Sequence, residues 1–145
     1  MSRITITKNI NAPVETVFKT VADIDSYSKA VPHIVKIEIL SDVKSGVGAR
    51  FRETRLMKGR EAATELEVTE YVENEHVRLV ADSHGTIWDS IFTVSPANGG
   101  VDLKLTMDAR AYKLLPKLLN PLIKGMIAKG VESDMDSGKA YCEKS

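Results

Sequence analysis

Glu53 and Arg55 stand two residues apart in the segment GARFRETRLMKG, which we interpret as a β-strand. Alternate residues of a strand share a face, so a buried Phe51 would bring both charged side chains inward with it. A carboxylate and a guanidinium could pair in a cavity, and Arg55 could bind a carboxylate or enolate oxygen of a ligand. The alternative is a bulge or an exposed position near a cavity mouth, because a shift of one residue reverses the faces.

Trp88 is the only tryptophan, and it shares a predicted strand face with Ser90 and Phe92. An aromatic plate beside a hydroxyl group suits a flat ring ligand with a polar edge. The competing interpretation is simple core packing, which is the more common use of a large aromatic side chain.

The histidines offer little for metal binding. His33, His76 and His84 lie in separate segments, and none is closely spaced with another histidine or a cysteine, so the sequence predicts no metal site. His84 and Asp89 flank a predicted turn and could form a proton-transfer pair, although exposed loop histidines are the commoner case. Cys142, the only cysteine, cannot form an intramolecular disulfide, and we interpret it as an inert helix residue.

Composition and missing motifs exclude several functions. The 20 basic and 20 acidic residues give a formal net charge of zero, so no overall positive field would attract nucleic acid or anionic lipid. The sequence contains no Gly-x-Ser-x-Gly elbow, phosphate-binding loop or dinucleotide fingerprint. It also lacks the pattern of a secretion signal or a membrane span. We therefore expect a cytoplasmic protein without cofactor, nucleic-acid partner or integral membrane segment.

The elements that would position these residues follow from two periods in the apolar pattern. Residues 3–10 alternate as in a half-buried strand, residues 13–22 have helical spacing, and Tyr27–Val31 is a short helical segment that Pro32 ends. Apolar and polar residues then alternate in six further segments separated by short turns, which predicts an antiparallel meander. These strands are expected at residues 35–40, 49–58, 62–69, 77–81, 86–95 and 101–111.

The segment Leu114–Lys144 returns to helical spacing, with Asn120 as a plausible cap and Pro121 in the first turn. A helix of about twenty residues spans roughly 30 Å, enough to cross the sheet. The order of elements predicts an α+β fold in one domain over residues 1–145, a curved seven-stranded antiparallel sheet wrapped around a long C-terminal helix. The apolar side of this C-terminal helix is expected to contain Leu122, Ile123, Met126, Ile127, Val131 and Met135.

Four segments carry a resemblance to a known family. They are INAPVETVFKTVADIDSYSKAVPHI after the opening strand, VGARFRE, ELEVTEY and GTIWDSIFTV. Through them the chain resembles the START-like (SRPBCC) superfamily of helix-grip proteins, and within it the polyketide cyclase/dehydrase and coenzyme Q-binding branch. The resemblance covers essentially the whole chain. It implies binding of lipids, sterols, quinones, polyketides or plant hormones, with cyclase activity in a minority of members.

We therefore expect a small, largely hydrophobic ligand, such as a lipid, a quinone or a polycyclic or polyketide compound, in a cavity between sheet and helix. A filled core without a cavity is the alternative. Two other functions remain open: a cyclase or dehydratase that uses Glu53, Arg55, Ser90 or a histidine, and a protein-interaction module with a large exposed apolar patch. The predicted ligand-binding residues are Phe51, Glu53, Arg55, Leu66, Trp88, Ser90, Phe92, Leu103, Leu105, Met107, Leu119, Leu122, Ile123 and Met126.

Overall fold

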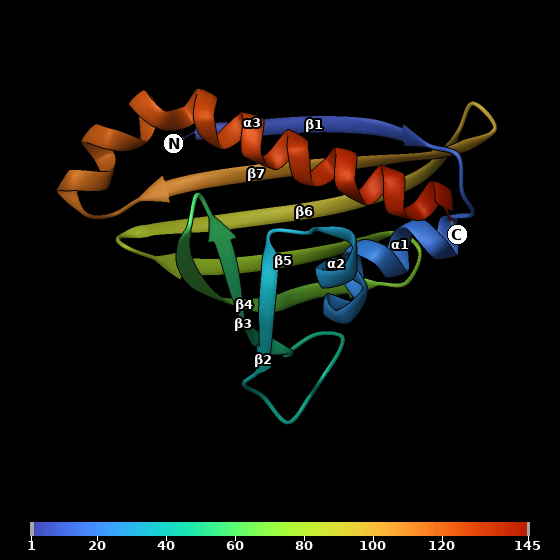
Figure 1. Ribbon diagram of the computed structural model, residues 1–145, viewed down its shortest axis with the longest axis horizontal. Helices are drawn as coiled ribbons and strands as arrows, with labels where there is room; N and C mark the ends of the chain where they lie inside the picture. Colours follow the sequence, from blue (N-terminus) through green and yellow to red (C-terminus); the bar gives the residue numbers. More distant parts are fainter. Residues whose placement is uncertain (1, 145) are drawn as a thin grey trace.

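The computed structural model describes residues 2–144, with the side chains of all of these except Ser2 and Met57. Within this range, seven strands form one antiparallel sheet that is accompanied by three helices (Figure 1), which confirms the predicted fold. The elements are β1 (Ser2–Ile10), α1 (Val14–Ala22), α2 (Ile24–Ala30), β2 (Ile34–Ile39), β3 (Arg50–Met57), β4 (Arg60–Val72), β5 (His76–Ser83), β6 (Thr86–Ala97), β7 (Gly100–Ala111) and α3 (Leu114–Lys144).

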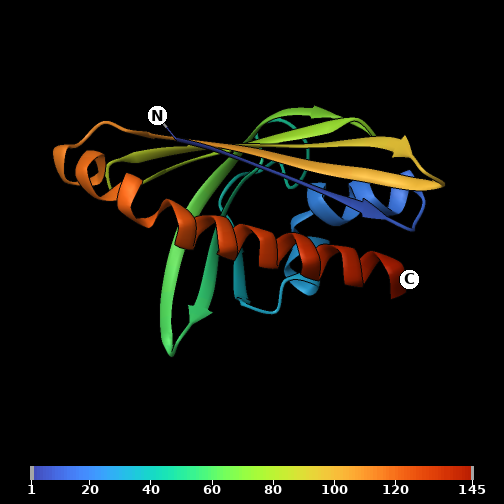
Figure 2. The same cartoon turned by 90° about the horizontal axis from the view of Figure 1, so that it is seen from above.

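The strands follow one another as a meander from β2 to β7, and β1 adds to the free side of β7. The first and last strands of the chain are thus neighbours, with Ile4 opposite Met107. Figure 2 shows the sheet folding around α3, which runs along its concave side. None of the described helices is long and apolar enough to cross a lipid bilayer.

The alternation read from the sequence corresponds to the two faces of the sheet. In β7, Val101, Leu103 and Leu105 are buried, whereas Lys104 between them is exposed. The hairpin before β7 closes at Asn98 and Gly99, which have φ values of 50° and 76°. Two consecutive residues with positive φ are what a tight hairpin turn of this hand requires, and asparagine and glycine tolerate that conformation best.

The filled part of the core lies where α1 and the second half of α3 meet the sheet. Val17 and Phe18 of α1 pack there together with Met135 and Cys142 of α3. In α3 the buried residues are all in this second half, at Met135, Gly138 and Cys142. No described residue in the first half of the helix is buried, so this half packs less closely against the sheet.

The sheet is split along β4. Residues 60–67 of this strand pair with β3, and residues 66–72 pair with β5, so that the two ladders overlap at Leu66 and Glu67 alone. Figure 1 shows β2 and β3 turned steeply away from the direction of β5, β6 and β7. The strong bend lets one continuous sheet enclose a space on its concave side.

The structure corrects the predicted start of the C-terminal helix. The helix begins at Leu114, so Asn120 is not its cap and Pro121 lies inside it. The amide of Asn120 instead donates a hydrogen bond to Thr86 Oγ1 at 3.0 Å. Proline has no N–H and cannot bond the carbonyl of Lys117 one turn earlier, which explains why this half of the helix bends (Figure 1).

The predicted apolar side of α3 is also partly wrong. Ile123, Ile127 and Val131 are partly buried, but Leu122 is 79% exposed and Met126 is 65% exposed. A residue and its immediate neighbour in a helix point about 100° apart, so Leu122 and Ile123 cannot both lie at the centre of one face.

Candidate ligand-binding cavity

A cavity of about 560 Å³ lies between the concave face of the sheet and α3. This volume is within the range of about 300–1,000 Å³ that is usual for small-molecule sites. Strands β3 to β7 form its walls, and all three helices contribute to its rim and cover. The lining residues are Val21, Ala22, Ile24, Tyr27, His33, Phe51, Glu53, Arg55, Thr64, Leu66, Leu79, Ala81, Ser83, Trp88, Ser90, Phe92, Leu105, Met107, Met126, Ile127, Gly130, Val131, Ser133 and Asp134.

Most of the cavity wall is apolar. Trp88 and Phe92 lie on the inward face of β6, with Ser90 between them as the notable hydroxyl of that strand. Tyr27 of α2 packs edge-on against Phe92, with ring centroids 6.0 Å apart and ring planes at 63°. Such edge-to-face contacts fix the orientation of aromatic rings. The wall is therefore shaped for an apolar body with few polar groups.

A cluster of charged side chains interrupts the apolar wall. Arg55 Nε donates to a carboxylate oxygen of Glu53 on the same strand, and its Nη1 donates to Asp134 Oδ2 of α3 at 2.8 Å. The Glu53 residue is only 7% exposed. Burial alone would lower the pKa of Arg55, but the nearby charges of Glu53 and Asp134 outweigh it and raise that pKa, so the guanidinium stays charged.

Tyr27 lies beside this cluster. Its enclosure, followed by the negative charge of Asp134, raises the pKa of its hydroxyl well above the usual value. The hydroxyl therefore stays protonated and remains a hydrogen-bond donor. Together the cluster contains one cationic group, one neutral phenol and two acidic side chains.

The structure brings most of the predicted site residues together. Phe51, Glu53 and Arg55 do share the inward face of β3, and ten of the fourteen predicted residues line the cavity. Leu103 lies instead in the filled core at 1% exposure, and Leu119, Leu122 and Ile123 are on the first half of α3 outside the lining. The ten are Phe51, Glu53, Arg55, Leu66, Trp88, Ser90, Phe92, Leu105, Met107 and Met126.

Fourteen of the 24 lining residues were not predicted from the sequence, and among them Tyr27 and Asp134 are the two that belong to the charged cluster. A signal for Asp134 existed, because it falls at positions i+3, i+4 and i+7 from Val131, Gly130 and Ile127. A carboxylate on the cavity side of an otherwise apolar stripe indicates a buried partner. Tyr27 offered no comparable signal, since its helix is short and its partners come from distant strands.

The hypothetical proton-transfer pair of His84 and Asp89 does not form. Asp89 lies on the outer face of β6, where Arg78 donates to both of its carboxylate oxygens at 2.8 Å and 2.6 Å. No group of three or more histidine, cysteine or acidic side chains within residues 2–144 is arranged to hold a metal ion. Cys142 is buried near Thr20, at 3.3 Å, and burial raises the pKa of its thiol.

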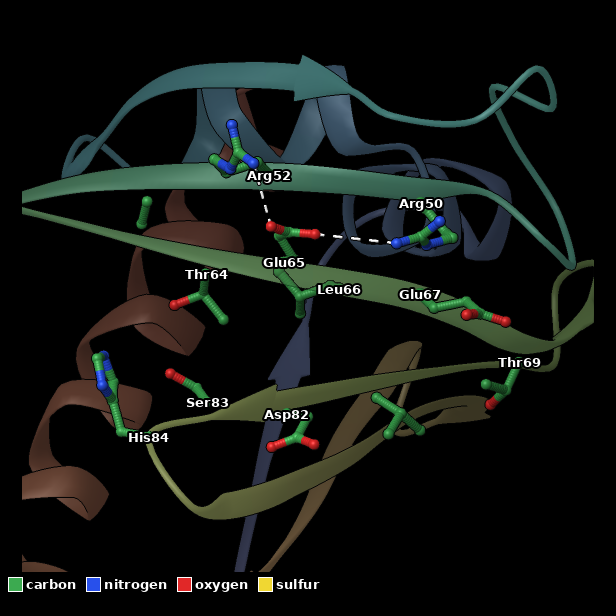
Figure 3. Close-up of a pocket in the computed structure, with 12 residues that line it drawn as sticks. Arg50, Arg52, Thr64, Glu65, Leu66, Glu67, Thr69, Asp82, Ser83 and His84 are labelled. Atoms are coloured by element: carbon green, nitrogen blue, oxygen red, sulfur yellow. Dashed lines mark hydrogen bonds and ion pairs between the residues drawn. The ribbon is translucent and has the colours of Figure 1, made fainter.

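A second hollow, of about 620 Å³, lies on the outer side of the sheet at the split between β4 and β5 (Figure 3). Its charged side chains largely satisfy one another, since Glu65 contacts Arg52 at 3.1 Å and Arg50 at 3.9 Å (Figure 3). Thr64, Leu66 and Ser83 line both this groove and the cavity. At the split, one layer of side chains therefore separates the cavity from the outside.

A family model described as "Polyketide cyclase / dehydrase and lipid transport" matches residues 1–143. The chain belongs to this family. The match confirms the resemblance that was predicted from the sequence segments.

Solved structures similar to this family member have the same fold. A START superfamily protein from Mycobacterium smegmatis is 19% identical, with a TM-score of 0.79 over 98% of this chain and 97% of that one. A protein from Thermus thermophilus is 17% identical, with a TM-score of 0.78 over 97% of each chain. The di-domain ARO/CYC StfQ from the steffimycin biosynthetic pathway is 12% identical, with a TM-score of 0.80 over 98% of this chain and 50% of that one. No curated protein matches the chain.

Proposed function

We propose that this protein binds a small, largely hydrophobic molecule in the cavity and holds or carries it without chemical change. The observation that carries the proposal is the cavity itself, about 560 Å³ of space with an apolar wall and one buried charged cluster. The family description, which names lipid transport, supports it. The apolar body of the ligand would contact Phe51, Leu66, Trp88, Phe92, Leu105 and Met107, with Ser90 at a polar edge.

The charged cluster gives the proposal a chemical preference. Arg55 already bonds both Glu53 and Asp134, so a ligand carboxylate would compete with two protein carboxylates for one guanidinium. Like charges a few Å apart repel by several kcal/mol at the effective dielectric of a partly buried site. A hydroxyl, phenol or amine can instead donate to the free lone pairs of these carboxylates. We infer a ligand whose polar group donates a hydrogen bond.

Matched ligand pairs test this preference by thermal unfolding. The pairs are 2-naphthol with 2-naphthoate and dodecanol with dodecanoate, which share a body and differ in the polar group. A ligand at about 100 times its Kd stabilises the folded state by about 2.7 kcal/mol. We expect the alcohols to raise the Tm by several degrees and the carboxylates to raise it little. Equal or larger shifts from the carboxylates would contradict the preference, and no shift from any compound would count against the cavity as the site.

The Asp134→Asn variant separates the charge argument from simple fit. It leaves one carboxylate opposite Arg55, so carboxylate ligands should gain affinity relative to their alcohols by about tenfold, or roughly 1.4 kcal/mol. Asp136→Asn is the matched control, because Asp136 lies on the same helix but pairs with Lys8 at the surface, 3.0 Å away. The control should keep the preference of the unaltered protein.

A cyclase or dehydratase is the second candidate, and the same cluster favours it. Glu53, Asp134 and the protonated Tyr27 hydroxyl are proton-transfer groups placed beside an apolar space that would hold a chain in a folded shape. If turnover of a polyketide analogue is found, it should fall in Glu53→Gln and Arg55→Ala. Turnover unchanged in both variants would exclude these residues from the chemistry.

A further inference from the structure

The first half of α3 has an apolar surface that no described residue covers. Leu114, Leu118, Leu122 and Met126 recur at every fourth position and are between 63% and 79% exposed. Leu115 stands beside this row and is equally open to solvent. Figures 1 and 2 show these turns of the helix at the end of the sheet, away from the filled core around α1. Large exposed side chains gathered in this way indicate a surface that another structure covers.

The charged residues of this stretch of the chain all have one sign. Between residues 109 and 131 the chain has five basic residues and no acidic residue, although its total charge is zero. Lys113, Lys117, Lys124 and Lys129 are exposed, and none of them forms an ion pair within residues 2–144. The fifth basic residue is Arg110, which lies 4.0 Å from the carboxylate of Asp89. The zero net charge thus conceals a local excess of positive charge.

We propose that residues 110–129 dock on the surface of an anionic membrane. A helix that lies in the membrane interface combines an exposed row of large apolar side chains with lysines that reach the anionic headgroups. Both parts are present here on one segment, with Leu114, Leu118 and Leu122 for the apolar boundary. Charge complementarity therefore identifies the occupant of this surface as an acidic lipid layer.

A second copy of the chain fits the same surface less well. Copies related by a two-fold axis bring identical patches together, so the lysines of one copy would face those of the other. That arrangement would place unpaired positive charges at the contact, whereas a lipid layer with negative headgroups would neutralise them.

Docking in this orientation would place the membrane next to the cavity. Met126 is 65% exposed on the docking surface and also lines the cavity, where it is followed by Ile127. The proposal goes beyond ligand binding and can be tested separately, because it concerns the surface of α3 and needs no bound ligand.

Flotation with lipid vesicles tests the proposal on the full chain. We expect the protein to float with vesicles made of equal parts phosphatidylcholine and phosphatidylglycerol, and not with phosphatidylcholine alone. Added salt should release it, because salt screens exposed charges. Replacing Lys117 and Lys124 by glutamine should weaken binding about fivefold for each lysine. Leu118→Ser with Leu122→Ser should weaken it by at least about tenfold, because both side chains would leave the lipid interface.

A control variant carries comparable substitutions, one apolar residue to serine and one lysine to glutamine, on another exposed segment. Val47→Ser with Lys44→Gln alters the loop between β2 and β3, where both residues are exposed, and should bind vesicles like the unaltered chain. Circular dichroism and the Tm should be unchanged in all variants, since none of these side chains is buried. Absence of vesicle binding, or binding that the α3 variants do not reduce, would overturn the proposal. The proposal would also be overturned if the protein did not bind vesicles and instead sedimented as a dimer that the Leu118→Ser and Leu122→Ser substitutions dissociate.

Discussion

Individual charged residues have different roles on the two faces of the sheet. On the outer face, Arg78 bonds Asp89 through two nitrogens and Glu70 at 2.8 Å, and Arg110 lies 4.0 Å from Asp89, so two guanidinium groups face two carboxylates. On the inner face, one guanidinium is shared between Glu53 and Asp134. The outer cluster holds β4, β5 and β6 together, whereas the inner cluster has hydrogen-bonding capacity left over for a ligand.

The outer cluster gives a prediction about pH. Hydrogen bonds from Arg78 and its positive charge hold the pKa of Asp89 below its ordinary value. A carboxylate with a lowered pKa in the folded state stabilises that state above the unfolded pKa, near pH 4, and loses this effect as the pH falls through the folded pKa. Asp89→Asn should therefore cost about 1–3 kcal/mol at pH 7 and progressively less as the pH falls below about 4.

Urea unfolding at pH 7 and at an acidic pH below about 4 measures the cost of Asp89→Asn under both conditions. Asp42→Asn is a suitable control, since Asp42 is exposed on the loop after β2 and should show little effect at either pH. A cost for Asp89→Asn that stays constant with pH would mean that the carboxylate charge does not contribute as described.

At the scale of one element, the two glycines of α3 offer a matched comparison. Gly130 lines the cavity, whereas Gly125 is exposed outside the lining. A Cβ added at either position would meet nothing within 4 Å. The two positions thus have similar helical surroundings, and they differ in what a longer side chain would enter.

Leucine at each position should stabilise the helix but affect ligand binding differently. Gly125→Leu and Gly130→Leu should each raise the free energy of unfolding without ligand by about 0.5–1 kcal/mol, because glycine is a poor helix former. Only Gly130→Leu should reduce the Tm shift caused by 2-naphthol, since its side chain would fill part of the cavity. Equal ligand shifts in the two variants would place the ligand elsewhere.

The same helix shows where sequence reasoning succeeds and fails. Local alternation was enough to predict the strands of the meander, and Glu53 and Arg55 were placed inward from Phe51 alone. The strand β2 is less regular, because Val35 is 51% and Ile39 is 41% exposed. The helix start was wrong because Pro121 usually marks a first turn and here lies inside the helix. Asp134 was missed because its partner Arg55 is 79 residues away, and such pairing depends on the folded sheet.

For the molecule as a whole, the decisive feature is the uneven filling of one curved sheet. The end where α1 meets the second half of α3 is packed solid, whereas a cavity remains under the middle of α3, at residues 126–134. Local patterns predict that a sheet and a helix will meet, but not how far apart they stay. That separation is set by the bend at β4 and by large side chains such as Phe18 and Met135, which hold α3 against one end of the sheet.

The split in β4 has a consequence for hydrogen exchange. Residues 60–65 pair with β3 alone, so alternate amides of this stretch point toward the gap in the sheet. We expect these amides to exchange with deuterium orders of magnitude faster than those at the centres of β6 and β7, which are paired on both sides. Mass spectrometry after short labelling would show it, and equal protection of residues 60–65 would mean that the gap is closed in solution.

An unpaired strand edge is also a template on which a foreign strand can add. In this stretch Arg60, Glu61 and Glu65 stand exposed beside the free edge. Charged side chains at such edges oppose self-association because an incoming copy would bring like charges together. The split beside the cavity thus gives a physical reason for Glu61 and Glu65 at this edge, because a more apolar edge strand would favour aggregation.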